Sequence, residues 1–145
     1  MSERAPRPAA RIVLTDPDDR VLLFRFTPPD RDPFWATPGG ACDPGEDFPT
    51  TAARELREET GLTLDCGPEI ARRQVEFTDL EGRPVAADER YFRVRAPTAD
   101  ILTEGHTALE RRLMTSHRWF APNELADWPE TIFPEDLADI LKETA

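Results

Sequence analysis

Three glutamates crowd one side of a segment that is suited to form a helix. Glu55, Glu58 and Glu59 lie in the sequence TTAARELREET. On a helix that advances about 100° per residue they fall within one arc of about 100°, whereas Arg54 points elsewhere. Carboxylates at i and i+4 repel, and each close pair costs up to about 3 kcal/mol at an effective dielectric near 20. Hard oxygen ligands gathered in this way suit Mg²⁺, or Mn²⁺ in its place.

A solvated acidic helix face is the alternative interpretation, because glutamate is a good helix former and runs of charge often mean nothing more. The spacing of the surrounding residues argues against it. Glu46 follows Gly40 after five intervening residues, the pair Arg54-Glu55 follows after seven more, and Gly61-Leu62 ends the pattern. By the chain's own composition, the nine specified positions would match by chance on the order of once in a million.

This pattern resembles the Nudix box, Gly-x5-Glu-x7-Arg-Glu-(apolar)-x-Glu-Glu-x-Gly-(apolar), with every fixed position met. The preceding Trp35-x-x-Pro38-Gly39-Gly40 is similar to the entry of such a box. The resemblance implies an α/β/α sandwich around a mixed β-sheet. It also implies a Mg²⁺-dependent hydrolase that cleaves a nucleoside diphosphate linked to another group X by attack of water on phosphorus.

Roles for individual residues come from the same resemblance. The catalytic residues that it implies are Glu46, Arg54, Glu55, Glu58 and Glu59. It implies that Glu55, Glu58 and Glu59 hold the metal with the carbonyl of Gly40, and that Arg54 and Glu46 orient the helix and its acids. We expect Glu55 to be the general base, although some family members recruit the base from a loop outside the box. The candidates for such an extra acid are Asp88, Glu89, Glu104 and Glu110, each of which could equally be a surface acid.

Three further residues are predicted to bind substrate. Arg25 and Trp35 lie where substrates of the family often approach, and Trp35 could instead be part of the core. Arg93 alternates with Val94 on a strand, so that its guanidinium could hold a phosphate or simply face solvent. The sequence carries none of the subfamily markers for particular nucleotides, so it does not identify the nucleobase or the X group of the substrate.

The segments that must position these residues follow from turn signals and hydrophobic periodicity. We expect a mobile tail over residues 1–9 and a single domain over residues 10–145. Asp47 is the predicted N-cap of the glutamate-bearing helix, Pro49 lies in its first turn, and Gly61 follows its end. The other expected elements are a hairpin of 11–15 and 21–26, a β-ribbon around 80–84, a strand over 117–121 and a closing amphipathic helix over 134–143.

Composition narrows the class of partner. Lys and Arg total 18 against 29 Asp and Glu, a net charge of −11, which argues against a nucleic-acid-binding protein. No apolar run reaches the length of a membrane span, and the two cysteines, Cys42 and Cys66, make neither a zinc site nor a disulfide framework. We therefore expect a cytoplasmic protein that acts on a small nucleotide, without nucleic acid or membrane as partner, and that could form a homodimer.

Two other functions stay open at this point. A Nudix-like regulatory module could bind a nucleotide or ADP-ribose without hydrolysing it, but such a binder has no need of Glu55, Glu58 and Glu59 together. A box-bearing isomerase would require a catalytic cysteine, for which Cys42 is the candidate.

Overall fold

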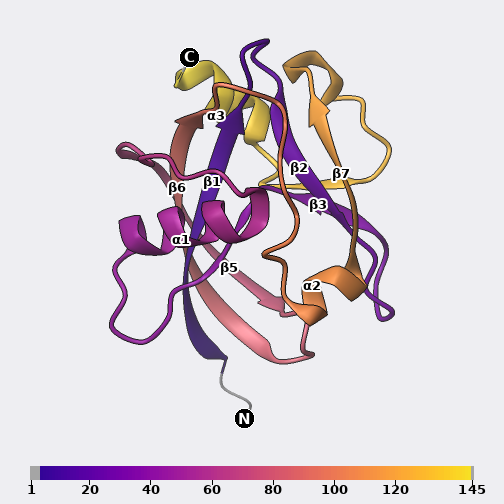
Figure 1. The fold of residues 1–145 in the computed structure, drawn as a ribbon. Coiled ribbons are helices and arrows are strands. Elements are labelled where there is room, and N and C mark those ends of the chain that lie inside the picture. The colour runs from indigo at the N-terminus through magenta and orange to yellow at the C-terminus, as the bar shows by residue number, and fades with distance from the viewer. Residues whose placement is uncertain (1–3, 145) are drawn as a thin grey trace.

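Eight strands form one mixed, curled β-sheet in the computed structural model of the protein, which describes residues 4–144 (Figure 1). The strands are β1 (Ala5–Thr15), β2 (Val21–Phe26), β3 (Phe34–Ala36), β4 (Gly39–Ala41), β5 (Glu69–Thr78), β6 (Pro84–Arg95), β7 (Met114–Phe120) and β8 (Thr131–Phe133). The helices are α1 (Phe48–Thr60), α2 (Ala108–Leu113), the 3-10 turn η1 (Pro122–Glu124) and α3 (Leu137–Glu143). Within residues 4–144 no helix is both long and apolar enough to span a membrane.

The sheet has two halves that meet where β1 and β2 pair at Thr15 and Val21. In the first half β1 runs parallel to β6, which pairs with β5, and antiparallel to β4. In the second half β2 lies between β7 and β3, and β3 runs parallel to β8. Helix α1 covers one face and α3 the other, so the predicted α/β/α sandwich with a mixed sheet is confirmed.

Local signals at both ends define α1. The Asp47 side chain accepts a hydrogen bond from the Thr50 backbone N–H at 2.8 Å, and Pro49 occupies the first turn. At the other end Gly61 has φ 77° and donates its N–H to the Arg57 carbonyl at 2.9 Å. Glycine adopts this left-handed conformation without steric cost, which is why the helix ends there as predicted.

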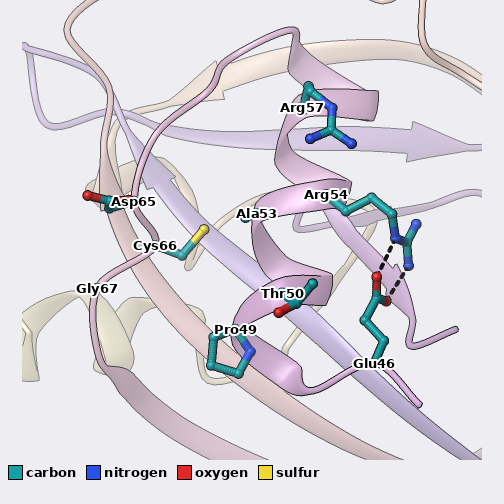
Figure 2. A pocket seen from close by; sticks show the side chains of 9 residues that line it. All are labelled: Glu46, Pro49, Thr50, Ala53, Arg54, Arg57, Asp65, Cys66 and Gly67. Atoms are coloured by element: carbon teal, nitrogen blue, oxygen red, sulfur yellow. Dashed lines mark hydrogen bonds and ion pairs between the residues drawn. The ribbon is translucent and has the colours of Figure 1, made fainter. Parts of the chain in front are cut away.

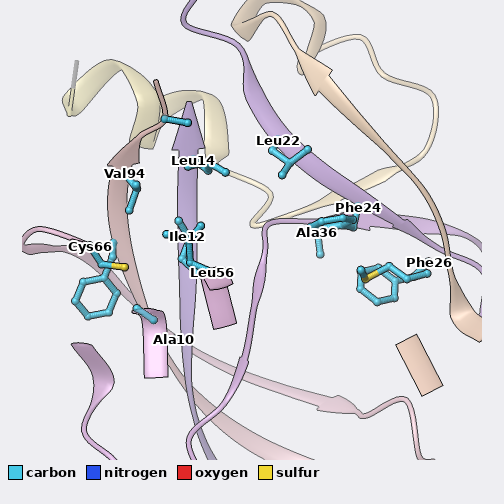
Figure 3. Packing of buried hydrophobic residues seen from close by; sticks show 14 residues of the cluster. Ala10, Ile12, Leu14, Leu22, Phe24, Phe26, Ala36, Leu56, Cys66 and Val94 are labelled. Carbon is cyan, nitrogen blue, oxygen red and sulfur yellow. The ribbon is translucent and has the colours of Figure 1, made fainter. Parts of the chain in front are cut away.

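Burial of alternate strand residues produces one apolar cluster on each face of the sheet. On the α1 side Leu56 packs with Ile12 and Leu14 of β1 (Figure 3). On the α3 side Trp35 packs with Phe120 and other large side chains. Complete burial of a side chain such as Leu56 contributes about 1.5–3 kcal/mol, so the two clusters fix α1 and α3 against the sheet.

The structure differs from the sequence-based expectation at the N-terminus. Strand β1 begins at Ala5 and pairs with β6 from its first residue, so residues 5–9 belong to the sheet; residues 1–3 lie outside the described part. The Pro8 carbonyl accepts a hydrogen bond from the Cys42 N–H, so the backbone nitrogen and oxygen of Pro8 face away from β6. Strand alternation places those of Pro6 on the same side. The prolines therefore remove no donor from the β1–β6 ladder, which the Pro-rich sequence did not reveal.

Candidate active site

Two glycines bring the backbone of β4 against both β1 and α1. Gly39 has φ 144°, and a Cβ at this position would lie 2.2 Å from the Ala10 carbonyl oxygen of β1. Its N–H donates to Glu59 Oε2 at 2.7 Å. A Cβ on Gly40 would lie 2.6 Å from Glu55 Oε1. Only glycine fits at position 39, where the contact is with backbone, whereas a side chain at position 40 would displace the Glu55 carboxylate. This close approach places β4 beside the carboxylates of the helix.

Glu55, Glu59 and Glu110 converge into one group, here called the carboxylate cluster. An oxygen from each lies within 4.8 Å of the others. Glu55 is 8% exposed and Glu59 only 2% exposed. Within residues 4–144 no ion pair reaches Glu59 or Glu110. Carboxylates brought together in this way repel one another, and a cation that bridges them would relieve that cost.

The pKa values in the carboxylate cluster reflect this crowding. Burial, with repulsion from Glu58 and Glu110, raises the pKa of Glu55 from 4.5 to about 7 despite the opposing effect of Arg54. Burial also raises the pKa of Glu59 well above its ordinary value, helped by the neighbouring Glu110 and Glu55. Both shifts have burial as their main cause and mutual repulsion as a further one, and Arg54 offsets them only in part, at Glu55.

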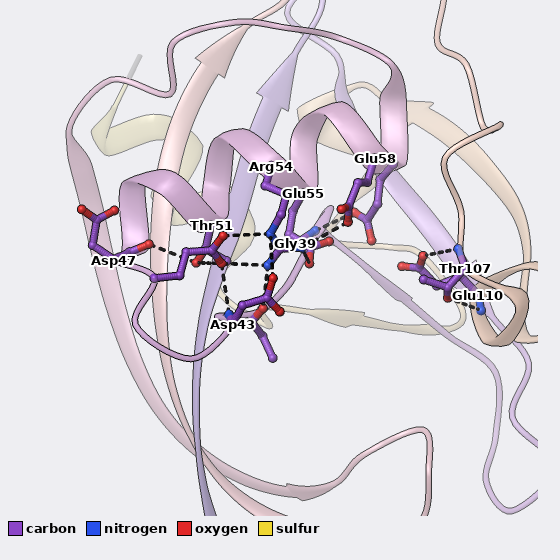
Figure 4. Close-up of polar contacts among 12 residues, drawn as sticks. Gly39, Asp43, Asp47, Thr51, Arg54, Glu55, Glu58, Thr107 and Glu110 are labelled. Carbon is purple, nitrogen blue, oxygen red and sulfur yellow. Dashed lines mark hydrogen bonds and ion pairs between the residues drawn. The ribbon is translucent and has the colours of Figure 1, made fainter.

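Arg54 organises a second set of charges, here called the Arg54 network, with Glu46 (Figure 2) and Glu58 (Figure 4). Its guanidinium forms a bidentate pair with Glu46 at 2.8 and 2.9 Å and contacts Glu58 at 3.1 Å. Donors from Arg54 and Thr51 lower the pKa of Glu46 to about 2. Arg54 also reaches Glu55 at 3.0 Å, so the expectation that it points away from the glutamates is wrong. A long flexible stem lets the guanidinium bend back along the helix surface.

A cleft of about 820 Å³ opens in front of the carboxylate cluster. One end carries aromatic rings from three separate strands: Phe26 and Phe34 stack at 5.2 Å, and Phe133, 44% exposed, lies edge-on to Phe34 at 5.6 Å. Basic side chains also line the cleft, namely Arg7, Arg11, Arg31 and Arg83. Apolar, cationic and carboxylate side chains thus line one cleft.

A family model described as NUDIX domain matches residues 5–142 of this chain. The chain belongs to the NUDIX domain family. The resemblance drawn from the spacing of the glutamates is therefore confirmed. The match covers nearly all the described structure, including the strands on both sides of the box.

Individual relatives of this NUDIX domain agree with that assignment. An RNA pyrophosphohydrolase of Caulobacter vibrioides is 47% identical over 60 residues, which cover 39% of this chain and 33% of the relative. One from Erythrobacter litoralis is 31% identical over 112 residues, covering 69% and 65% of the two chains. The crystal structure of a MutT protein from Methanosarcina mazei Go1 has the same fold, with TM-score 0.75, 19% identity, and coverage of 99% and 95%. The chain matches only about a third of the length of the first relative.

The NUDIX box residues divide between the carboxylate cluster and the Arg54 network. Glu55 and Glu59 meet in the cluster, with Gly40 beside Glu55. Among the described residues, Glu58 is outside the cluster: its side chain is 37% exposed and pairs with Arg54. Its predicted role as a metal ligand stays a prediction.

The extra acid that the sequence could not choose is brought to the site by α2. Of the four candidates, Glu110 joins Glu55 and Glu59. Glu89 lines the cleft but pairs with Arg11 at 3.1 Å, while Asp88 pairs with Arg90. The sequence Thr107-x-x-Glu110 is a capping box, a signal that predicts the start of a helix here and that our sequence analysis missed.

The predicted substrate-binding residues are not brought to the cleft within the described part of the chain. Trp35 lies in the apolar cluster under α3, and its Nε1 donates to Glu130 at 2.7 Å. Arg25 forms a bidentate pair with the same glutamate, at 2.7 and 2.9 Å. Arg93 donates to Thr144 at 2.9 Å. Strand alternation sends Phe34 to the cleft and Trp35 to the other face, so substrate contacts for these three residues stay predictions.

A second hollow, of about 580 Å³, lies along the outer side of α1 (Figure 2). Arg57, Cys66 and the Arg54–Glu46 pair line it. Cys66 is buried, and burial raises the pKa of its thiol. Cys42 is half-buried and has a free thiol. Arg54 and Glu46 neutralise each other in this hollow. The hollow therefore differs from the cleft, where carboxylates face one another.

Proposed function

We propose that this NUDIX domain is a metal-dependent pyrophosphohydrolase that cleaves a nucleoside diphosphate linked to X by attack of water on phosphorus. The observation that carries the proposal is the convergence of Glu55, Glu59 and Glu110, all three of which line the cleft. A binding module would not need buried carboxylates held together against their repulsion, because anionic phosphates bind better to cations alone.

The carboxylate cluster fits a divalent cation by the chemistry of its donors. All three side chains offer carboxylate oxygens, which suit Mg²⁺ or Mn²⁺. When bound, such a cation neutralises phosphate charge and lowers the pKa of water. Gly39 holds one oxygen of Glu59 through its N–H, which leaves the other oxygen for a ligand. We assign Glu59 and Glu110 as metal-binding residues, with Glu58 as a further candidate.

Glu55 is the residue that we assign as proton acceptor. It contacts Arg54 through one oxygen, and this ion pair orients its carboxylate beside Gly40. Glu46 holds the other side of the same guanidinium, so Arg54 and Glu46 act as positioning residues. The proton of the attacking water would pass to Glu55, and the leaving phosphate would depart towards the basic side chains of the cleft.

The substrate that we propose is a small nucleotide. The volume of the cleft lies within the usual range of small-molecule sites, about 300–1,000 Å³. The exposed ring of Phe133 and its neighbour Phe34 offer a surface on which a base can stack. The cytoplasmic location and the homodimer expected from the sequence stay predictions, and light scattering of the purified protein would measure its oligomeric state.

Product release tests this function directly. Nucleoside triphosphates, oxidised purine nucleotides, dinucleoside polyphosphates, nucleotide sugars, ADP-ribose and a 5′-triphosphorylated RNA would be offered with Mg²⁺, with Mn²⁺ or with chelator. We expect turnover that requires metal and is lost in Glu59→Gln and Glu110→Gln. Glu104→Gln is the matched control, because Glu104 is an exposed acid on the same segment as Glu110. Micromolar binding of one compound without turnover of any would instead establish a non-hydrolytic binding module.

A further inference from the structure

The segment before α2 docks on the C-terminal end of α1, where the helix carries Glu58 and Glu59. The Leu102 N–H donates to the Thr60 carbonyl at 2.8 Å. Gly105 lies against the helix backbone so closely that a Cβ would sit 2.4 Å from the Glu58 carbonyl oxygen. In Figure 1 this segment passes the end of α1 on its way to α2. The contact therefore joins two parts of the chain that are distant in sequence.

His106 makes the side-chain contact at this junction. Its Nε2 lies 2.8 Å from the carbonyl oxygen of Glu59. A carbonyl oxygen only accepts, so Nε2 carries the proton and donates it. The ring is half-buried and packs edge-on to Phe24, with centroids 5.6 Å apart. Carbonyls in the last turn of a helix lack partners within the helix, and the imidazole supplies one to Glu59.

The next residue along the chain begins the helix that carries Glu110. Thr107 Oγ1 accepts from the Glu110 N–H at 3.1 Å, and the Thr107 N–H donates to Glu110 Oε1 at 2.9 Å (Figure 4). Arg111 donates to the carbonyls of Glu104 and His106 at 2.7 and 3.2 Å. One oxygen of Glu110 is thus fixed to the residue that follows His106. A short, hydrogen-bonded path connects the backbone of Glu59 with the carboxylate of Glu110.

We propose that His106 is a positioning residue of the carboxylate cluster: its bond to the Glu59 carbonyl sets where Glu110 stands relative to Glu55 and Glu59. The inference rests on the proposed function, since it assumes that these three carboxylates bind a divalent metal. Without the bond, the docked segment and α2 keep only the Leu102–Thr60 hydrogen bond and the packing of Gly105 as ties to the end of α1. Glu110 then swings away from the other two carboxylates, which lowers the affinity for metal before any substrate is present.

Binding of Mn²⁺ to the substrate-free protein, followed by electron paramagnetic resonance, tests the inference. We expect His106→Leu to weaken Mn²⁺ binding roughly tenfold or more, as loss of residues that orient metal ligands commonly does. His106→Gln retains an N–H donor and should recover part of the affinity. Gly105→Ala should weaken binding in the same way, because its Cβ forces the segment away from the Glu58 carbonyl. This second variant leaves the imidazole intact and guards against an effect of lost packing.

The protein has two histidines, which supplies a matched control. His117 also packs edge-on to Phe24, at 6.0 Å, but it lies on β7 and is exposed. His117→Leu should leave Mn²⁺ affinity unchanged. The ¹⁵N resonances of the two imidazoles give a readout that is independent of metal, and the His106 ring should be the Nε2–H tautomer.

The outcomes separate this inference from the proposed function. If wild type binds Mn²⁺ and His106→Leu, still folded, binds it equally well, the positioning role is wrong while the metal site stands. An Nδ1–H tautomer at His106 would also contradict the role. If wild type does not bind Mn²⁺ at all, the metal-dependent function and the inference both fail. Glu110→Gln calibrates the scale, since it removes one carboxylate outright.

Discussion

Two groups of acidic side chains meet along α1, and their carboxylates have opposite pKa shifts. In the Arg54 network, the guanidinium satisfies Glu46 with two hydrogen bonds and lowers its pKa to about 2. In the carboxylate cluster, the pKa of Glu55 is raised to about 7 and that of Glu59 is also well above its ordinary value. Glu46 and Glu55 are the same residue type and both contact Arg54, so the contrast comes from the burial of Glu55 beside other carboxylates rather than from residue type.

The difference separates residues that hold the fold from residues that need something to bind. A carboxylate with a fixed cation contributes stability that is available without any ligand. Buried carboxylates that face each other cost stability until a proton or a cation relieves them. The packing of α1 against the sheet, its two caps and the Arg54 network offset that cost. Substitutions in the Arg54 network and in the carboxylate cluster should therefore have different effects on stability and on metal-dependent activity.

The largest expected effect is on catalysis by Glu59. Glu59→Gln should lower metal-dependent turnover at least about 1,000-fold, equivalent to about 4 kcal/mol of transition-state stabilisation, because the cluster loses its most deeply buried ligand. Glu58→Gln should cost about tenfold, since Glu58 belongs to the Arg54 network. Steady-state kinetics of the two variants at saturating Mg²⁺ would measure both. A larger loss in Glu58→Gln would reverse the assignment of the two acids.

The stability of the metal-free protein should fall as pH rises. Glu55 keeps its proton up to about pH 7 when folded but loses it near pH 4.5 when unfolded, so the free energy of unfolding declines between these values. This group alone contributes a change of about 3 kcal/mol. Thermal unfolding in chelator from pH 4 to 8 would show the slope, and Mg²⁺ should remove most of it.

Two variants sharpen that measurement. Glu55→Gln should reduce the slope between pH 4.5 and 7, because it removes one of two titrating groups and leaves Glu59, whose pKa is also raised. Glu46→Gln should leave this part of the profile unchanged. The pKa of Glu46 is lowered, so its contribution is complete above its unfolded value and is lost only as pH falls towards 2. A flat profile in the metal-free wild type would contradict the strain that we ascribe to the cluster.

The sequence predicts those features that depend on neighbouring residues better than those that depend on contacts between distant segments. Asp47, Pro49 and Gly61 act within one turn of α1, and all three lie where the sequence places them. The first part of β1, from Ala5, forms because it pairs with β6, which is distant in sequence. The local sequence is Pro-rich and has no hydrophobic periodicity, so it did not predict a strand. Box spacing put Glu55 and Glu59 on one helix face, but only the fold selected Glu110 among four acids.

Strand alternation explains the remaining gap. Trp35 directly follows a residue that lines the cleft, and Arg25 directly precedes one. Proximity in sequence therefore suggested proximity to substrate, whereas neighbouring residues of a strand face opposite sides of the sheet. Which side faces the site depends on where α1 packs, and a single sequence does not contain that information. The aromatic surface of Phe34 and Phe133 could not be recognised for the same reason.

Loss of the Arg54 network should lower stability in addition to its effect on the orientation of Glu55. Arg54→Ala leaves Glu46 without its bidentate partner and should lower the free energy of unfolding by about 2 kcal/mol. Arg54→Lys should recover only part of this, because a lysine cannot form the paired contact. Urea unfolding at pH 7 would measure both variants. An unchanged midpoint in Arg54→Ala would show that the network does not hold the helix.

The smallest effect is expected on the opposite face, at Trp35. Trp35→Phe keeps an aromatic ring in the cluster under α3 but removes the hydrogen bond from Nε1 to Glu130. Loss of this single bond should lower the free energy of unfolding by about 1 kcal/mol. The KM for substrate should stay within about twofold of wild type, because a ring on this face does not reach the cleft and a twofold change is worth only about 0.4 kcal/mol. A KM raised tenfold with normal stability would show that substrate does contact Trp35. The assignment of the substrate site to the α1 face of the sheet alone would then be wrong.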